Sequence, residues 1–316
     1  MNIIYMGTPE FAVKPLQAIV DAGHKVLACF TQPDKPKGRG KTLQPTPVKE
    51  KALSLDIPVY QPVKLREENV QIIRDYQPDA IVVAAYGQIL PESILNIPQY
   101  GCINIHASLL PKYRGAAPIE WTIINGETES GVTTMYMAKG LDTGDMIEKT
   151  VVPIADTDTG VTLHDKLADA GAELILSTLS KLEDHTAIRT PQDDSLSCYA
   201  SMLKKEMGEL DFTKSARQIE CLIRGLNPWP SAFTHLNGKM LKIWDADVVN
   251  DSDDIINNNN VSKECEAGTV CYVDKKTFII KCGKDYLKVN ELQLEGKKRM
   301  STDAFLLGSH VEEGTA

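Results

Sequence analysis

The chain has 316 residues, of which 42% are hydrophobic and 24% charged, and these values are ordinary for a soluble globular protein of one or two domains. Its formal net charge of −9 argues against a general affinity for nucleic acid, so any RNA contact must come from a local cluster of Lys and Arg. No segment approaches the roughly 20 apolar residues of a membrane span, and the N-terminal apolar run is too short for a signal peptide, so we expect no membrane association.

The seven cysteines are scattered along the chain, and none forms a Cys-x-x-Cys pair. An odd number of unclustered cysteines indicates reduced thiols, with neither a disulfide framework nor a structural zinc site. The His and acidic residues do not form a ligand set either, so no metal is expected. This pattern is typical of a cytoplasmic protein.

The first half of the chain alternates strand and helix patterns. Residues 2–6, 25–30, 79–85 and 101–106 predict buried strands, and a helix is expected after the first of them. This order predicts a doubly wound, mostly parallel α/β sheet of the Rossmann-like type. The Gly-x-Gly-x-x-Gly fingerprint is absent after the first strand, and Pro9 removes a backbone donor there, so we reject a dinucleotide site.

A basic loop, residues 31–47, follows the second predicted strand. It is rich in Gly and Pro, and its charges are almost all positive. Such a run is usually only a solvated surface loop. Its departure from the carboxyl end of a sheet strand and its single sign of charge favour contact with a phosphate backbone instead. Its cationic residues include Lys35, Lys37, Arg39 and Lys41.

Asn104 and His106 form the most informative pair in the chain. They lie two residues apart in the alternating segment 101–106, and residues two apart on a strand point to one face of the sheet. An amide donor beside an imidazole can bind a developing oxyanion and move a proton in one place. A single histidine near a strand end is more often structural, so this pattern alone leaves both interpretations open.

Two loops strengthen the catalytic interpretation. Loop 107–118 follows the strand directly, and loops at strand carboxyl ends carry the ligand sites of open α/β sheets. Asp142 lies in the glycine-flanked loop 140–145, between predicted strands at 131–137 and 146–154. Its carboxylate can support the charged form of an imidazole. Together these side chains suit acyl transfer to an amine without a covalent enzyme intermediate.

The second half of the chain changes character. A long helix is predicted over 160–182, and the polar, irregular segment 190–208 is interpreted as a linker. We expect a catalytic domain over residues 1–189 and a C-terminal domain over residues 209–316. After a helix near 216–224, short strand patterns predict a small OB-like β-barrel. These patterns cover residues 231–236, 240–249, 268–273, 277–282 and 286–294.

Two features of the second half are interpreted as having no binding function. The segment 250–266 is rich in Asn and acidic residues, so it is expected to be a surface loop that builds no core. Trp229 lies between two prolines and is expected to be a buried anchor of the second domain.

Four short motifs together resemble those of the folate-dependent formyltransferases. Their order and spacing make the combination far more specific than any single motif. The resemblance extends from the first strand to the last predicted strands near residue 294. The motifs are Asn104-x-His106, Ser108-Leu109-Leu110-Pro111, Arg114-Gly115-Ala116-Ala117-Pro118 and Leu141-Asp142-Thr143-Gly144-Asp145.

The resemblance implies an activity and a set of site residues. The activity is transfer of the formyl group of 10-formyltetrahydrofolate to the α-amino group of methionine on initiator methionyl-tRNA, for translation initiation. The implied catalytic residues are Asn104, His106 and Asp142. The implied folate contacts are Ser108, Leu109, Leu110, Pro111, Ile89 and Leu90, and the implied tRNA contacts are Arg39, Lys41, Lys37 and Lys35.

Several alternatives remain at this point. Glycinamide ribonucleotide formyltransferases resemble only the first domain. Amino-sugar formyltransferases also carry a second domain, although the basic loop argues against them. A non-catalytic folate- or RNA-binding protein is a third alternative, and the intact set of Asn104, His106 and Asp142 argues against it. We expect a cytoplasmic monomer that works without a metal.

Overall fold

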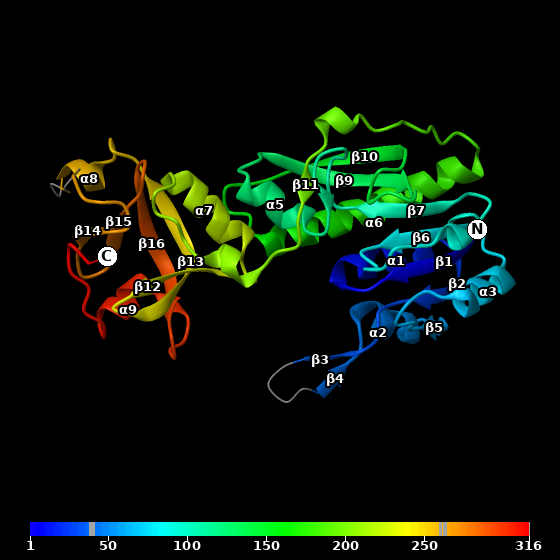
Figure 1. Cartoon of the computed structure of the whole chain (residues 1–316), viewed down its shortest axis with the longest axis horizontal. Coiled ribbons are helices and arrows are strands. Elements are labelled where there is room, and N and C mark those ends of the chain that lie inside the picture. Colours follow the sequence, from blue (N-terminus) through cyan, green and yellow to red (C-terminus); the bar gives the residue numbers. More distant parts are fainter. Residues whose placement is uncertain (38–41, 259–260, 262–263, 316) are drawn as a thin grey trace. The chain divides into compact units, whose positions relative to one another are not determined.

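The computed structural model describes residues 1–37, 42–258, 261 and 264–315. The chain forms two compact units (Figure 1). The first consists of residues 1–118, 129–153 and 164–201, and the second of residues 119–128, 154–163 and 202–316. The predicted linker is thus divided between the two units at residues 201 and 202, and the predicted domain boundaries stay predictions.

The first unit is built on a sheet whose strands are β1 (Asn2–Gly7), β2 (Lys25–Phe30), β5 (Val59–Tyr60), β6 (Ala80–Ala84), β7 (Cys102–His106), β9 (Glu129–Tyr136) and β10 (Met146–Pro153). Their order across the sheet is β10-β9-β7-β6-β1-β2-β5 (Figure 1). The pairs from β7 to β5 are parallel, whereas β9 pairs antiparallel with both β7 and β10. Strands β1, β2 and β5 follow one another toward one edge of the sheet, whereas β6 and β7 follow one another toward the opposite edge. The strand order therefore reverses between β1 and β6. Ligand sites of such sheets lie near this reversal.

Helices cover both faces of this sheet. They are α1 (Val13–Asp21), α2 (Pro47–Ser54), α3 (Glu67–Tyr76), α4 (Glu92–Leu95) and α6 (Gly160–Glu183), with the 3-10 helices η1 (Glu10–Ala12) and η2 (Asp194–Leu196). On one face, Ile73 of α3 and Ile94 of α4 share an apolar cluster with Ile81 of β6. On the other, the Thr178 hydroxyl of α6 lies 2.8 Å from that of Thr134 in β9. Burial on both faces explains the nearly continuous apolar strands.

The second unit is built on an antiparallel sheet whose strands are β12 (Ala232–Leu236), β13 (Lys239–Val249), β14 (Val270–Val273), β15 (Phe278–Lys281), β16 (Tyr286–Leu294) and β17 (Met300–Ser301). Their order is β12-β13-β16-β15-β14, with β17 paired to β16. Among the described residues, the remaining helices are α5 (Pro118–Ile124), η3 (Lys205–Gly208), α7 (Ala216–Gly225), α8 (Asp254–Asn258) and α9 (Thr302–Leu306). Helix α7 buries Ile219 and Ile223 in a cluster that includes Leu241 of β13 and Leu287 of β16. The predicted fold class, a mostly parallel α/β sheet followed by a smaller antiparallel domain, is confirmed.

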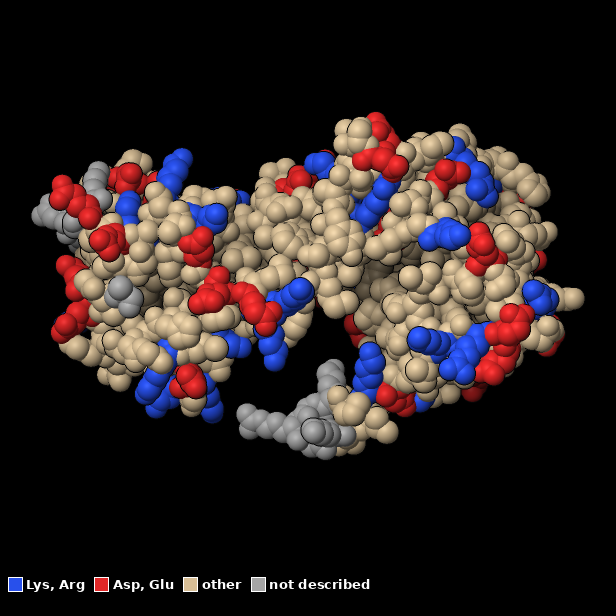
Figure 2. All heavy atoms as spheres, in the orientation of Figure 1, with Lys and Arg blue, Asp and Glu red and all other residues tan. Residues whose placement is uncertain are grey.

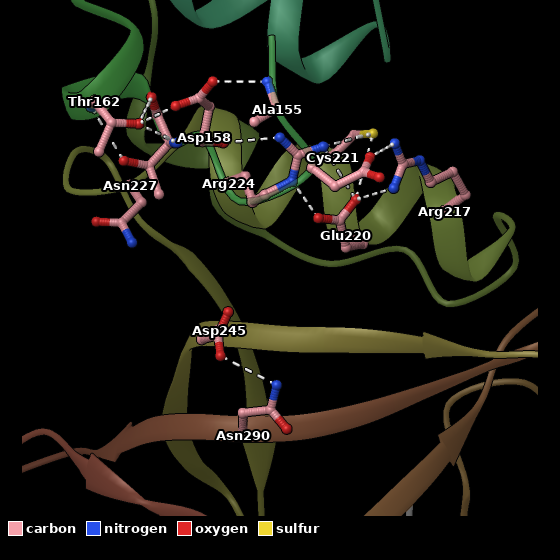
Figure 3. Close-up of polar contacts among 12 residues, drawn as sticks. Ala155, Asp158, Thr162, Arg217, Glu220, Cys221, Arg224, Asn227, Asp245 and Asn290 are labelled. Carbon is pink, nitrogen blue, oxygen red and sulfur yellow. Dashed lines mark hydrogen bonds and ion pairs between the residues drawn. The ribbon is translucent and has the colours of Figure 1, made fainter. Parts of the chain in front are cut away.

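A buried ion pair ties segment 154–163 to α7 (Figure 3). Arg224 and Glu220 lie one turn apart on α7, and both side chains are buried. The Arg224 guanidinium also donates a 2.8 Å hydrogen bond to the backbone carbonyl of Asp158. The Asp158 carboxylate in turn accepts hydrogen bonds from the backbone N–H of Ala155 and the hydroxyl of Thr162. These contacts explain why this segment belongs to the second unit, although it lies between two parts of the first in sequence.

Two expectations about this unit are wrong. The Asn-rich segment does build a core, because Ile256 and Val261 are buried in a cluster with Tyr286. These few apolar residues pack into a core although the segment is rich in Asn. Trp229 is 53% exposed instead of buried, because Leu226 and Ala232 fill the core positions on either side of it in the chain.

Among the residues that the structure describes, no helix combines the length and the apolar character needed to cross a membrane. Figure 2 shows acidic and basic side chains interspersed over the visible face of the described residues in both units. This distribution agrees with the argument that the chain lacks a general affinity for nucleic acid.

Candidate active site

Asn104 and His106 lie on one face of β7, as their spacing predicts. Cys102 shares this face and is buried in the apolar cluster beneath α4. Toward the carboxyl end of the strand the same face becomes polar, and Asn104 pairs in register with Val83 of the central strand β6. His106 is almost fully buried, with 5% of its surface exposed. The site therefore lies where an apolar core meets polar groups, which favours strong electrostatic interactions.

Asp142 reaches this face from the loop between β9 and β10. Its backbone is left-handed, with φ +52°, a conformation that non-glycine residues adopt only rarely. The next glycine is required by packing, because a Cβ atom on Gly144 would lie 1.8 Å from the carbonyl oxygen of Tyr136. The loop thus turns tightly against β9 and presents the Asp142 carboxylate to β7.

The three predicted catalytic side chains are brought together. One carboxylate oxygen of Asp142, Oδ2, lies 3.7 Å from Nδ1 of His106. The other, Oδ1, lies 3.5 Å from Nδ2 of Asn104. Both distances exceed those of short hydrogen bonds, so the amide and the imidazole face the carboxylate without being tightly bound to it.

The contact of the second ring nitrogen of His106, Nε2, shows that this nitrogen carries a hydrogen. Nε2 lies 2.9 Å from the backbone carbonyl oxygen of Tyr113. Because a carbonyl oxygen only accepts hydrogen bonds, Nε2 must carry a hydrogen. In the neutral ring, Nδ1 would then direct a lone pair at the Asp142 carboxylate. In the charged ring it directs an N–H at the carboxylate, and this second arrangement is the attractive one.

The backbone of Gly115 holds the Asp142 carboxylate. Its N–H donates a 3.0 Å hydrogen bond to Oδ2, the oxygen that faces His106. Gly115 lies in β8 (Arg114–Gly115), which pairs with β11 (Tyr199–Ala200). Its φ is +119°, and an added Cβ atom would lie 2.6 Å from the carbonyl oxygen of Ala200. Gly115 belongs to one of the four family motifs, but the motif alone does not indicate this role.

The predicted folate segment, Ser108 to Pro111, begins two residues after His106 and is held by two side chains. The hydroxyl of Thr133 in β9 donates to the Ser108 carbonyl and accepts from the Leu110 N–H, at 2.7 and 3.1 Å. Lys149 of β10 donates a hydrogen bond to the Leu110 carbonyl. Desolvation by partial burial lowers the pKa of Lys149. Neither Thr133 nor Lys149 is singled out by a sequence motif, because both are brought here by strand pairing. Leu109 of this segment is partly buried.

The other predicted folate residues, Ile89 and Leu90, follow β6, the neighbour of β7 in the sheet. Leu90 is buried in the apolar cluster, whereas Ile89 is 82% exposed. Leu141, next to Asp142, is also largely exposed. Two loops near the polar trio thus present apolar side chains to the surface, and such side chains suit the faces of a planar aromatic ring.

The basic loop begins as a hairpin of β3 (Lys35–Lys37) and β4 (Thr42–Gln44). At its base, Asp34 accepts 2.6 Å hydrogen bonds from Lys49 and Gln61, and these hydrogen bonds lower the pKa of Asp34. Lys35 is exposed. Two of the predicted tRNA contacts, Arg39 and Lys41, lie outside the described residues. The structure describes the backbone of Lys37 within β3.

Family models match both halves of the chain. One described as Formyl transferase matches residues 1–179, and one described as Formyl transferase, C-terminal domain, matches residues 202–310. The chain belongs to the formyl transferase family. The family that the four motifs predicted is therefore confirmed, as is the prediction of a formyl-transferring enzyme.

Relatives in the formyl transferase family match over their full lengths. A protein named methionyl-tRNA formyltransferase from Agathobacter rectalis is 54% identical over 316 residues, covering 100% of this chain and 99% of that protein. One of the same name from Geobacter sulfurreducens is 49% identical over 316 residues, covering 100% of this chain and 96% of that protein.

Two solved structures share the fold of this chain. An N-formyltransferase from Helicobacter canadensis, in complex with folinic acid and dTDP-3-aminofucose, matches with a TM-score of 0.66 at 20% identity, over 94% of this chain and 99% of that chain. HypX from Aquifex aeolicus, in complex with tetrahydrofolic acid, matches with a TM-score of 0.60 at 14% identity, over 99% of this chain and 50% of that chain. At these identities the likeness concerns the fold alone.

Proposed function

We propose that this chain transfers the formyl group of 10-formyltetrahydrofolate to the α-amino group of methionine on initiator methionyl-tRNA, and that it does so as a cytoplasmic monomer. The observation that carries the proposal is the convergence of Asn104, His106 and Asp142 on one face of β7, in a chain of the formyl transferase family. The full-length relatives named methionyl-tRNA formyltransferase support methionyl-tRNA as the acceptor.

The residues present fit a folate donor. Exposed Ile89 and Leu141 offer apolar surface to a pterin ring, and hydrogen bonds with Thr133 and Lys149 hold the Ser108–Pro111 backbone in place near His106. 10-Formyltetrahydrofolate supplies the formyl group, which leaves its nitrogen for the methionine amine while one proton passes from that amine to the donor nitrogen. Ser108, Leu109, Leu110 and Pro111, with Ile89 and Leu90, would bind the donor chiefly through backbone groups.

Each catalytic residue has a task that its geometry supports. Nδ2 of Asn104 carries two hydrogens, so it can donate one to the formyl oxygen while the other faces Asp142. His106 in its charged form adds positive charge on the same side, and together they stabilise negative charge on that oxygen. Asp142 supports the charged imidazole and accepts the proton that the amine loses, through a water molecule.

The basic loop is the proposed binding surface for the tRNA substrate. In the sequence, β2 is followed by Lys35, Lys37, Arg39 and Lys41, and a cluster of one sign attracts the phosphates of an RNA acceptor end. Arg39 is the chief contact, because a guanidinium can form paired hydrogen bonds to a phosphate.

The test is a competition between acceptors. Purified protein is given 10-formyltetrahydrofolate and either initiator methionyl-tRNA or a nucleotide-linked amino sugar, and formyl product is measured for each. We expect formylation of the tRNA-bound methionine alone. Preferential formylation of the amino sugar would reject the proposed acceptor, and no product with either acceptor would favour a binding protein.

A further inference from the structure

The segment 190–201 is more than a connection between domains, because it is hydrogen-bonded to elements of the candidate site. Thr190 and Met146 exchange two backbone hydrogen bonds of 2.9 Å at the start of β10. Further on, β11 pairs with β8, and the N–H of Arg114 donates to the carbonyl of Cys198. The segment is therefore fixed to the first unit on both sides of Gln192.

The side chain of Gln192 makes three hydrogen bonds, two of them to the backbone of the Asp142 loop. Its Nε2 donates to the backbone carbonyls of Asp142 and Gly144, both at 2.8 Å. Its Oε1 accepts a 2.9 Å hydrogen bond from Nε of Arg114. A guanidinium only donates and carbonyls only accept, so the chemistry of the partners fixes the orientation of the amide.

These contacts close a ring around Asp142. Gln192 donates a hydrogen bond to the backbone carbonyl of Asp142, and Gly115 donates one to its carboxylate. Arg114 connects Gln192 with Gly115, because it is hydrogen-bonded to Gln192 and precedes Gly115 in the chain. Arg114 is itself held by a 2.7 Å salt bridge to Asp194. The carboxylate of Asp142 is thus held by β8 directly, and its backbone carbonyl is held by β8 through Gln192.

The Asp142 loop needs such support from outside. It contains two glycines, and Asp142 itself has a left-handed backbone, a conformation that is unfavourable for a residue with a Cβ atom. A misplacement of about 1 Å at a catalytic group can cost about 100-fold in rate. The two hydrogen bonds from Gln192 to the Asp142 and Gly144 carbonyls are suited to preventing this.

We infer that Gln192 is a positioning residue for Asp142, acting through the loop backbone and oriented by Arg114. This inference rests on the proposed catalytic role of Asp142. Gln192 touches no reacting atom. It sets the distance between the Asp142 carboxylate and His106, and thereby the stability of the charged imidazole during formyl transfer.

The experiment compares Gln192→Met and Gln192→Glu with wild type in steady-state formylation of methionyl-tRNA. Met keeps the length without hydrogen bonds, and Glu keeps the acceptor for Arg114 but turns an oxygen toward two carbonyls. We expect kcat to fall by about 10- to 100-fold for both variants, with nearly unchanged KM for the formyl donor and nearly unchanged Tm. Gln71→Met is a matched control on α3, where Gln71 bonds only to Asp75 among its described partners, and it should behave as wild type.

The pH profile and a double variant separate positioning from a merely structural role. The pH–rate profile of Gln192→Met should move in the same direction as that of Asp142→Asn, and Gln192→Met should add little to the loss in the Asp142→Asn background. Full additivity, or a loss of Tm without a change in kcat, would overturn the inference. If Asp142→Asn itself were fully active, the catalytic proposal would fail first.

Discussion

The N–H of Gly115 donates a hydrogen bond of 3.0 Å to the Asp142 oxygen that faces His106. The carboxylate is thus held on one side by backbone and turned toward the imidazole on the other. A carboxylate fixed in this way keeps its charge close to the group that it has to stabilise, without reorganising during the reaction.

His106→Ala should lower formyl transfer by about 10²–10⁴-fold, the usual contribution of a positioned acid–base group. Binding of the folate donor should change little, because the ring faces Asp142 and the Tyr113 carbonyl. Turnover and donor affinity are measured in the purified variant. Near-normal turnover would remove His106 from the mechanism.

Asp142→Asn keeps the size of the side chain and removes its charge. The charged form of His106 then loses its ionic partner, so we expect a large loss of rate with an intact fold. In the proposed mechanism Asp142 supports the charged imidazole, so the pH–rate profile should also differ from that of wild type. The measurement is kcat across a pH series, with Tm as the control for folding. The same rate and the same pH profile as wild type would refute this role.

Arg39→Ala should weaken the use of methionyl-tRNA, and Arg39→Lys should restore only part of it, because Lys cannot form the paired hydrogen bonds of a guanidinium. Loss of one phosphate contact should also flatten the log–log salt dependence by roughly 0.7–0.9. Formylation is measured at several salt concentrations, with a small amine as a control acceptor that should be unaffected. Identical kinetics and salt slopes would mean that the basic loop is only a solvated surface.

Glu220→Ala should destabilise the second unit by about 3–5 kcal/mol, because it leaves the buried Arg224 guanidinium without its carboxylate (Figure 3). The matched control is Asp156→Ala, which breaks the exposed ion pair with Arg217 and should cost at most about 1 kcal/mol. All three tryptophans of the sequence lie in the second unit, so their fluorescence reports its unfolding in urea. Equal effects of the two substitutions would contradict the assignment of a buried pair.

Glu148→Gln should destabilise the first unit in a pH-dependent manner. Partial burial by itself raises the pKa of Glu148, but hydrogen bonds from Lys181, Thr178 and Ser177 outweigh it and hold the pKa below its usual value. The charged carboxylate therefore stabilises the folded state above its ordinary pKa, and this stabilisation is lost as the pH falls through the lowered value.

The difference in unfolding free energy between wild type and Glu148→Gln should accordingly be largest near neutral pH and shrink in acid. Ser177→Ala removes only one donor and should give a smaller difference with the same dependence. A difference that stays constant over the whole pH range would show that the charge of Glu148 is not the cause.

Local patterns were sufficient for the longer strands and for half of the candidate site, but not for short strands such as β5. The alternation in β7 correctly places Asn104 and His106 on one face, because side-chain direction on a strand depends only on neighbouring backbone angles. The five strands predicted for the second unit agree with β12 to β16 to within two residues at their ends, whereas the short β17 is not predicted. The motifs around them were enough to predict the family.

Tertiary structure alone decided how distant segments meet. The approach of Asp142 to His106, the hydrogen bond from Gly115 and the amide of Gln192 all join segments far apart in sequence, and no local pattern encodes such pairings. Burial was decided at this level too. Ile256 is buried within an Asn-rich segment and Trp229 is exposed between two prolines, because the space left by neighbouring elements, not the residue's own surroundings in sequence, determines which side chains enter a core.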